Sequence, residues 1–313
     1  MPEKISLRET YGQTLLELGR ENRGIVVLDA DLANSTMTRY FGSEFPERFF
    51  DCGVAEQDMV GIAAGLAASG KIPFVSTFAV FAPGRCFDQI RMSVAQPLFN
   101  VKIVATHGGI SVGEDGTSHQ SIEDLALIGA LPGFRVIVPA DAVETAQAVR
   151  AAASIEGPFY IRLPRPKMPP VFGDNYRFAP GKAAILREGK DATIIAIGIM
   201  VSTALEAAAQ LVEDGIECRV LNMSTLKPID KEAIIRAARE TGAIVTAEEH
   251  LEHGGLGSIV ARVTGRSQPV PLDYIAVKDT YAQSGKDREL MEKYGLTAEA
   301  IGTAVRSVTA RKE

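Results

Sequence analysis

Short apolar runs alternate with helical patterns along the first half of the chain. Runs rich in Val, Ile and Phe predict buried strands at residues 24–31, 73–77, 101–106, 134–141 and 159–163. Helical periodicity predicts helices over residues 58–69, 83–95 and 122–129, and another from the end of the fourth strand to residue 153. Strands of continuous Val and Ile character that alternate with helices are typical of a parallel sheet covered on both faces.

A proline-rich segment interrupts this alternation. Six prolines lie between Pro158 and Pro180, and few regular elements tolerate that density. We therefore place a linker at roughly residues 165–188. It separates a first domain over residues 1–175 from a second, smaller domain over residues 189–313.

The alternation of strands and helices resumes after the linker. Strands are predicted at residues 192–198, 218–223, 243–249 and 272–277. Helices are predicted over residues 201–213, 230–241 and 257–265, and from about residue 297 to 308. Asp230 and Thr297 are the expected N-caps of two of these helices. The predicted fold class is α/β, with two domains that each hold a mostly parallel sheet flanked by helices.

Charge and composition exclude several classes of protein. The formal net charge is −6 and no run of Lys or Arg stands out, so we expect neither a nucleic-acid nor an acidic-membrane partner. The longest uncharged stretch of the second half, residues 192–205, is too short to cross a bilayer, and the N-terminus has no signal-like pattern. Three widely spaced cysteines favour a reducing compartment, so we expect a cytoplasmic protein.

The most unusual segment is a polar loop over residues 107–121, directly after a predicted strand. It contains His107 and His119, which are half of the histidines in the chain. A long polar loop at the carboxyl end of a strand is where α/β folds place ligand sites. The alternative is that both histidines lie in an ordinary surface loop.

Three other positions are candidates whose spacing alone does not decide their role. Glu56 lies where a strand passes into a helix, and an acid at a helix N-terminus is also favoured simply by the helix dipole. Phe78 and Phe81 follow a predicted strand, where packing in the core is an equally good explanation.

Two motifs carry a resemblance to a known family. The run DCGVAEQDMVGIAAGLAASGKIPFVSTFAVF, followed by ATHGGISVGEDGTSHQSIEDLALIGALPGFRVIVPAD, resembles the pyrimidine-binding domain of transketolases. GEDGTSHQ with the following IEDLA is the most specific part. Residues 190–313 also resemble the transketolase C-terminal domain, so the resemblance is collinear over nearly the whole chain.

The resemblance implies a thiamine diphosphate site. Glu56 matches the catalytic glutamate that hydrogen-bonds N1′ of the aminopyrimidine and so favours the tautomer that deprotonates the thiazolium carbon. Phe81 matches the aromatic residue that stacks on the pyrimidine, and Phe78 is its neighbour. Asp31 matches an aspartate close to the cofactor. His119 matches a residue that contacts the ketol end of the donor.

The resemblance also implies a sugar-phosphate site. Arg8, Ser35, His107 and an arginine of YIRLPRP match the residues that hold the sugar phosphate. Arginine suits the phosphate because a guanidinium donates two parallel hydrogen bonds to such a group. Arg165 is preferred over Arg162 because the family's arginine ends the strand. Asp115 matches a residue that recognises an acceptor hydroxyl. Together these residues favour a polyhydroxylated sugar phosphate over a simple 2-oxo acid.

The diphosphate side of such a site has no counterpart in the sequence. Family members hold the diphosphate through a divalent metal bound by a Gly-Asp-Gly motif, and the chain contains none. We therefore expect no metal ligand here, and Mg²⁺ or Ca²⁺ on a separate N-terminal transketolase subunit. The expected assembly is an α2β2 heterotetramer in which this chain is the C-terminal subunit of a split transketolase, active only with its partner.

Other functions stay open at this point. A subunit resembling 1-deoxyxylulose-5-phosphate synthase or the β chain of a 2-oxo acid dehydrogenase is an enzymatic alternative. A regulatory partner that binds a complete transketolase is a non-enzymatic one. The second domain is expected mainly to support assembly. Its Glu249-His250-x-x-His253 run is a weak zinc pattern, and a loop after a strand is the favoured interpretation.

Overall fold

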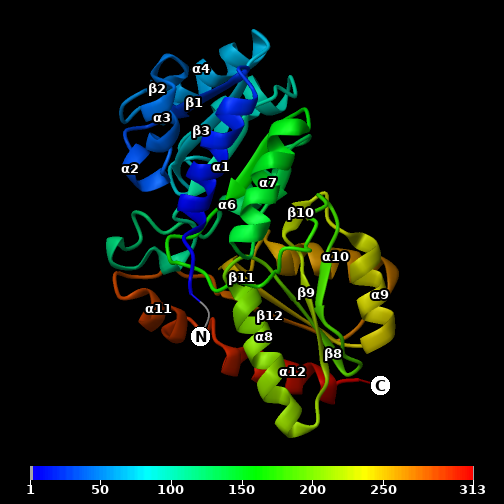
Figure 1. The fold of residues 1–313 in the computed structure, drawn as a ribbon. Coiled ribbons are helices and arrows are strands. Elements are labelled where there is room, and N and C mark those ends of the chain that lie inside the picture. Colours follow the sequence, from blue (N-terminus) through cyan, green and yellow to red (C-terminus); the bar gives the residue numbers. More distant parts are fainter. Residues whose placement is uncertain (1–2, 313) are drawn as a thin grey trace.

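The computed structural model describes residues 3–312 as two α/β domains stacked end to end (Figure 1). The first sheet has the strand order β10-β5-β6-β4-β3-β1-β2, and the second has the order β12-β11-β8-β9-β7. All pairings are parallel except those of β10 with β5 and β7 with β9. The predicted fold class is confirmed.

The strands of the first sheet are short, and all but those at residues 49–51 and 225–227 were predicted. They are β1 (Ile25–Asp29), β2 (Phe49–Asp51), β3 (Ile72–Phe78), β4 (Lys102–Thr106), β5 (Arg135–Ile137), β6 (Phe159–Arg162) and β10 (Thr225–Lys227). The helices of this part of the chain are α1 (Leu7–Glu21), α2 (Ala33–Thr36), α3 (Arg39–Glu44), α4 (Glu56–Ala68), α5 (Phe87–Gln89), α6 (Asp124–Ala130) and α7 (Ala142–Ser154). Short 3-10 turns lie at Pro46–Arg48 and Ile110–Asp115, and a π-helix lies at Ile90–Ala95.

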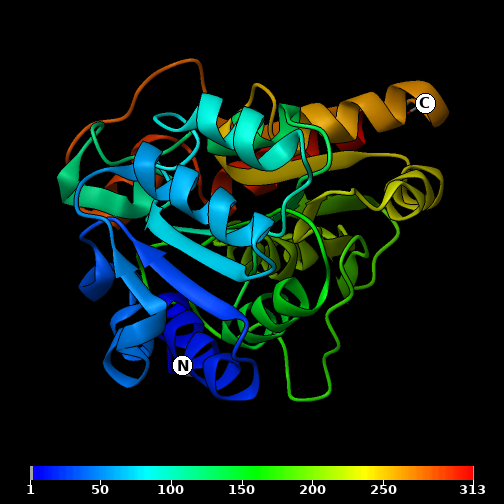
Figure 2. The same ribbon diagram turned by 90° about the horizontal axis from the view of Figure 1, so that it is seen from above.

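Alternate residues of each strand face opposite layers, which is why the predicted runs are mostly apolar on both faces. Ile25 and Val27 pack with α1 and α7, while Val26 and Leu28 pack with α4 and the π-helix. Seen from above, α4 and α1 lie on opposite sides of this sheet (Figure 2).

The second domain repeats the three-layer arrangement. Its strands are β7 (Ala184–Arg187), β8 (Ala192–Ala196), β9 (Cys218–Asn222), β11 (Ile244–Leu251) and β12 (Leu272–Val277). Its helices are α8 (Met200–Gln210), α9 (Lys231–Thr241), α10 (Leu256–Ser267), α11 (Asp287–Lys293) and α12 (Ala298–Ala310), and a 3-10 turn lies at Leu211–Asp214. Both predicted N-caps are confirmed: the side chain of Asp230 accepts a hydrogen bond from Ala233 N, and that of Thr297 accepts one from Ala300 N.

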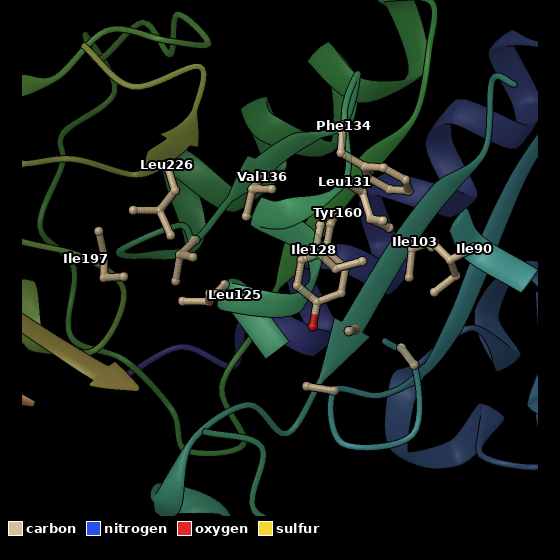
Figure 3. Close-up of a cluster of buried hydrophobic side chains, with 14 of the residues drawn as sticks. Ile90, Ile103, Leu125, Ile128, Leu131, Phe134, Val136, Tyr160, Ile197 and Leu226 are labelled. Carbon is tan, nitrogen blue, oxygen red and sulfur yellow. The ribbon is translucent and has the colours of Figure 1, made fainter. Parts of the chain in front are cut away.

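The two domains share a strand and a core. β10 follows β9 of the second sheet but pairs with β5 of the first, with Thr225 opposite Ile137. Leu226 and Ile197 therefore pack in one cluster with Val136 and Leu125 of the first domain (Figure 3). The packing fixes the second domain against the carboxyl end of the first sheet.

Several elements differ from the sequence prediction. The segment assigned to the linker contains β7, an edge strand that pairs antiparallel with β9. The helix predicted from residue 83 begins at Phe87 and continues as the π-helix. Helix α1 was not predicted, although Ser6 accepts a hydrogen bond from Glu9 N in the S-x-x-E pattern of a capping box.

Candidate functional site

The candidate residues gather where parallel strands of the first sheet end. The strands β6, β4, β3 and β1 are neighbours, so their carboxyl ends meet at one edge of the sheet. Phe78 ends β3, His107 follows β4, and Leu163 to Arg165 follow β6. Residues far apart in sequence therefore line one region between the sheet edge and the second domain.

Glu56 is the first residue of α4 and is buried, with 2% of its surface exposed. Arg85 Nη1 lies 2.8 Å from each of its carboxylate oxygens. A carboxylate at a helix N-terminus is stabilised by the helix dipole. Burial of a charge is nevertheless costly without a partner, so Arg85 compensates for the burial of Glu56.

An aromatic cluster lies beside Glu56. The rings of Phe78 and Phe81 are stacked with centroids 5.9 Å apart, and His107 stacks on Phe78 at 3.8 Å. His119 meets the edge of Phe81 at 5.4 Å. Arg85 links the cluster to Glu56, because its guanidinium carbon lies 4.5 Å from the centre of the Phe81 ring. Phe78 is buried, whereas Phe81 keeps part of its surface accessible.

His107 is held in a constrained conformation. Its backbone has φ +58°, a region that non-glycine residues seldom occupy, and its Nδ1 lies 2.9 Å from Thr106 Oγ1. Burial lowers the pKa of the His107 ring to about 3, with the charges of Arg8, Arg165 and His119 acting in the same direction. The ring is therefore a neutral hydrogen-bonding group near pH 7.

Two arginines from distant segments lie together beside this loop. Arg8 Nη1 donates to Ser35 O at 2.7 Å, and Arg8 Nη2 donates to Arg165 O at 3.4 Å. Arg165 Nη1 in turn donates to Val112 O at 2.5 Å and lies 3.4 Å from Asp115 Oδ2. Burial and the nearby Arg165 both lower the pKa of the Arg8 guanidinium. Concentrated positive charge of this kind attracts an anion.

Arg162 is engaged elsewhere. It is buried, its Nε lies 3.0 Å from Asp124 Oδ2, and its Nη2 donates to Ser121 O and to Glu249 O. Arg165, by contrast, lines an open cavity of ≈ 360 Å³ with Arg8. The geometry thus leaves Arg165, and not Arg162, available to a ligand.

Asp31 lies apart from this group. It is exposed two residues beyond the end of β1, and its backbone amide donates to Asp51 Oδ1 at 3.0 Å. Nothing in residues 3–312 joins its carboxylate to Glu56 or Phe81 by a hydrogen bond or an ion pair. Its expected proximity to the cofactor stays a prediction.

The second domain reaches the site through Glu249, a contact that the sequence did not reveal. Glu249 lies in β11 and is buried, and its Oε1 accepts a hydrogen bond from Ser111 N at 2.5 Å. Gly109, at φ +88°, packs so closely that a Cβ atom there would come 2.1 Å from Glu249 Cδ. Burial raises the pKa of the Glu249 carboxyl to about 7. The residue anchors the polar loop to the second domain.

The histidines of the second domain do not form a cluster. His250 lies within β11, not in a loop after it, and its Nδ1 and Nε2 contact Leu251 O and Ala126 N at 2.8 and 3.4 Å. His253 is exposed in the following turn. Over residues 3–312, no group of three or more His, Cys, Asp or Glu side chains is placed to hold a metal ion. None of the helices in this same range is both long and apolar enough to span a bilayer.

Comparison with known proteins identifies both domains. Residues 3–170 match the family model "Transketolase, pyrimidine binding domain", and residues 181–301 match "Transketolase, C-terminal domain". A 6-deoxy-6-sulfo-D-fructose transketolase subunit of a Clostridium species is 45% identical, over 99% of this chain and 96% of its own length. An apulose-4-phosphate transketolase subunit of Phocaeicola vulgatus is 41% identical, over 95% of each chain. A solved structure described as a split gene transketolase, an inactive β4 tetramer, has 53% identity and a TM-score of 0.91, over 99% of this chain and 100% of its own.

Proposed function

The chain belongs to the transketolase family, and on that premise we propose that it is the C-terminal subunit of a split, thiamine diphosphate-dependent transketolase. The observation that supports this most directly is that Arg85 joins Glu56 to the aromatic cluster, while His107 of that cluster is close enough to Arg8 and Arg165 for their charges to lower its pKa. A buried carboxylate, an accessible aromatic face and an anion site in one region are what ketol transfer between sugar phosphates requires. The complex would move a two-carbon ketol unit from a ketose phosphate to an aldose phosphate.

The residues fit an aminopyrimidine. Arg85 already places a flat, N–H-donating group against both the Glu56 carboxylate and the Phe81 ring. An aminopyrimidine is also flat and has polar nitrogens at its rim, so the same two groups suit it. Thiamine diphosphate, when bound, supplies the carbon nucleophile that takes up the two-carbon unit.

The chain's own residues would hold and orient this ring. Glu56 would hold a proton at N1′ once the ring has taken the place of Arg85 beside its buried carboxylate. Phe81 would stack on the ring, Phe78 would support Phe81, and Asp31 would lie near the cofactor. His119, at the edge of Phe81, would contact the ketol end of the donor.

The second group of residues would bind the sugar phosphate. Arg8 and Arg165 would pair with the phosphate, with Ser35 and the neutral ring of His107 as further contacts. Asp115, which is exposed beside Arg165, would accept a hydrogen bond from a sugar hydroxyl. A hydrogen-bond acceptor such as Asp115 beside the hydrogen-bond donors Arg8 and Arg165 suits a polyhydroxylated substrate better than a 2-oxo acid.

A partner would supply the rest of the site. The sequence has no Gly-Asp-Gly, so the diphosphate and its Mg²⁺ or Ca²⁺ would lie on an N-terminal transketolase subunit. We expect an α2β2 heterotetramer acting in the cytoplasm, in the sugar-phosphate exchanges of the pentose phosphate pathway.

Reconstitution tests this function. The purified chain, mixed with the N-terminal subunit, Mg²⁺ and thiamine diphosphate, should convert xylulose 5-phosphate and ribose 5-phosphate, and neither subunit alone should do so. Calorimetry should show weak cofactor binding by the isolated chain. Turnover of pyruvate in place of the sugar phosphates would contradict ketol transfer. Tight, metal-dependent cofactor binding by the chain alone would contradict the split site.

A further inference from the structure

A short segment of the second domain forms one wall of the cavity at Arg8 and Arg165. Gln120 Nε2, at the end of the polar loop, donates to Gln283 O at 3.0 Å. Gly116, at φ +72°, approaches the same segment so closely that a Cβ atom there would come 2.5 Å from Ser284 Oγ. These contacts fix the backbone at residues 283–285, directly before Lys286.

Lys286 lines the cavity together with Arg8, Arg165 and Ser111. Its side chain is 73% exposed, and its one ion pair among the described residues 3–312, with Glu289, is long at 3.8 Å. A contact of that length between exposed groups restrains a lysine only slightly. The ammonium is therefore free to turn toward a ligand in the cavity.

Two buried donors at the same place lack partners within residues 3–312. Arg8 Nε and Ser111 Oγ are each shielded from solvent and make no hydrogen bond. Unsatisfied buried polar atoms are costly, so a small rotation of either side chain toward a ligand in the cavity would be favourable.

The charge of the lining favours an anion that also carries hydroxyl groups. Three cations, Arg8, Arg165 and Lys286, face two carboxylates, those of Glu114 and Asp287. One oxygen of Asp287 already accepts a hydrogen bond from Arg288 N at 2.8 Å. The lining side chains carry one positive charge in excess, and Asp115 and Glu289 lie beside Arg165 and Lys286 at 3.4 and 3.8 Å. The guanidinium and ammonium groups suit an anion, and the carboxylates suit the hydroxyls of a sugar chain.

We propose that Lys286 completes the binding site for the tetrahedral oxyanion at the end of the sugar substrate, so that the second domain takes part in substrate recognition. The proposal rests on the proposed ketol transfer and extends it, since it assigns a specificity role to the domain otherwise expected only to support assembly. The lysine ammonium acts here as a mobile charge beside the planar guanidinium groups of two arginines. Phosphate and sulfonate share the required chemistry.

The test compares donors with and without the terminal anion in the reconstituted complex. An uncharged acceptor, glycolaldehyde, is used so that only the donor carries phosphate. Lys286→Met should raise KM for xylulose 5-phosphate about 5- to 20-fold, the range for losing one charged hydrogen bond near solvent. The value of kcat/KM for xylulose, which lacks the phosphate, should not change. A ketose donor that ends in a sulfonate distinguishes phosphate from sulfonate recognition. A similar rise in KM for both donors in the Lys286→Met complex indicates that the site recognises the oxyanion that they share.

Two further variants control the comparison. Lys286→Arg should recover most of the affinity because it restores the charge. Lys182→Met removes a similarly exposed lysine, 63% accessible and 3.5 Å from Glu232, which lies outside the cavity. It should leave the kinetics with both ketol donors unchanged. Circular dichroism confirms folding of each variant.

The outcomes separate this proposal from the proposed function. An unchanged KM for the phosphorylated donor, or an equal loss with xylulose and xylulose 5-phosphate, would overturn the role of Lys286 while ketol transfer stands. If the wild-type complex transfers no ketol unit, the proposed function fails. The cavity is then tested by calorimetry with inorganic phosphate, where weaker binding by the Lys286→Met chain supports the anion site and equal binding refutes it.

Discussion

Arg85 Nη1 lies 2.8 Å from both carboxylate oxygens of Glu56, while the Arg85 guanidinium carbon lies 4.5 Å from the centre of the Phe81 ring. The Arg85 guanidinium therefore occupies the place between the Glu56 carboxylate and the Phe81 ring that we assign to the cofactor's aminopyrimidine. It also neutralises a carboxylate that is almost completely buried. A ring that binds in this place has to displace the guanidinium, so the same contact stabilises the free chain and competes with its ligand.

The ion pair should contribute measurably to the stability of the isolated chain. Arg85→Met leaves the Glu56 side chain, 3% exposed, without its cation and should reduce the free energy of unfolding by about 1–3 kcal/mol. The double variant Arg85→Met/Glu56→Gln should recover part of that loss, because a neutral amide is cheaper to bury. Urea unfolding measures both. Arg288→Met is the control, since its pair with Glu292 is exposed and should contribute less than about 0.5 kcal/mol. Equal effects of the two single variants would contradict the argument.

Glu56 should be essential for turnover but not for folding. In the reconstituted complex, Glu56→Ala should abolish measurable activity, and Glu56→Gln should lower kcat at least about 100-fold, the usual contribution of a positioned acid or base. Steady-state kinetics with thermal unfolding as the folding check gives the result. Near-normal kcat in either variant would favour a regulatory role for this chain.

Phe81 should contribute to cofactor affinity through its ring. Phe81→Ala removes the accessible aromatic face and should weaken thiamine diphosphate binding by the complex roughly 10- to 50-fold. Phe81→Tyr keeps the ring and should bind within about twofold of the wild type. Fluorescence titration measures both dissociation constants. If the alanine and tyrosine variants behave alike, the ring does not stack on the cofactor.

His107 should stay neutral throughout the working pH range. Its pKa of about 3 results from burial first and from neighbouring positive charges second. A base with a lowered pKa favours the folded state above its ordinary pKa of 6.5, and that stabilisation is lost as pH falls toward 3. The ¹⁵N resonances of the ring, assigned by their loss in His107→Asn, should not shift between pH 5 and 8, and His107→Asn should flatten the acid decline in stability. Titration of this ring near pH 6.5 would contradict the buried environment.

Glu249 should produce the opposite pH dependence. Burial raises its pKa to about 7, so its contribution is complete below the ordinary value of 4.5 and is lost as pH rises to about 7. Glu249→Gln is neutral at every pH and keeps an oxygen that can accept from Ser111 N, so the variant should lose less stability than the wild type between pH 5 and 8. Thermal unfolding across that range, measured on both chains, decides the point. Parallel curves would show that Glu249 does not titrate there.

The sequence alone determined the layered architecture and the identity of the main site loops. Strands buried on both faces are mostly apolar, so the Val and Ile runs at β1, β4 and β8 could be identified without tertiary information. The caps at Asp230 and Thr297 depend on contacts within three residues, which is why they were predictable. The long polar loop after β4 was visible as an interruption of the same pattern.

Only the tertiary structure decided which residues meet. Glu249 bonds to Ser111 across 138 positions, Arg8 and Arg165 meet across 157, and β10 leaves its own domain to extend the first sheet. Periodicity records which face of an element is buried but not which element covers it. The pairing of Arg85 with Glu56 and the position of Lys286 in the cavity depend on how the elements and domains pack, and that packing is a property of the folded chain.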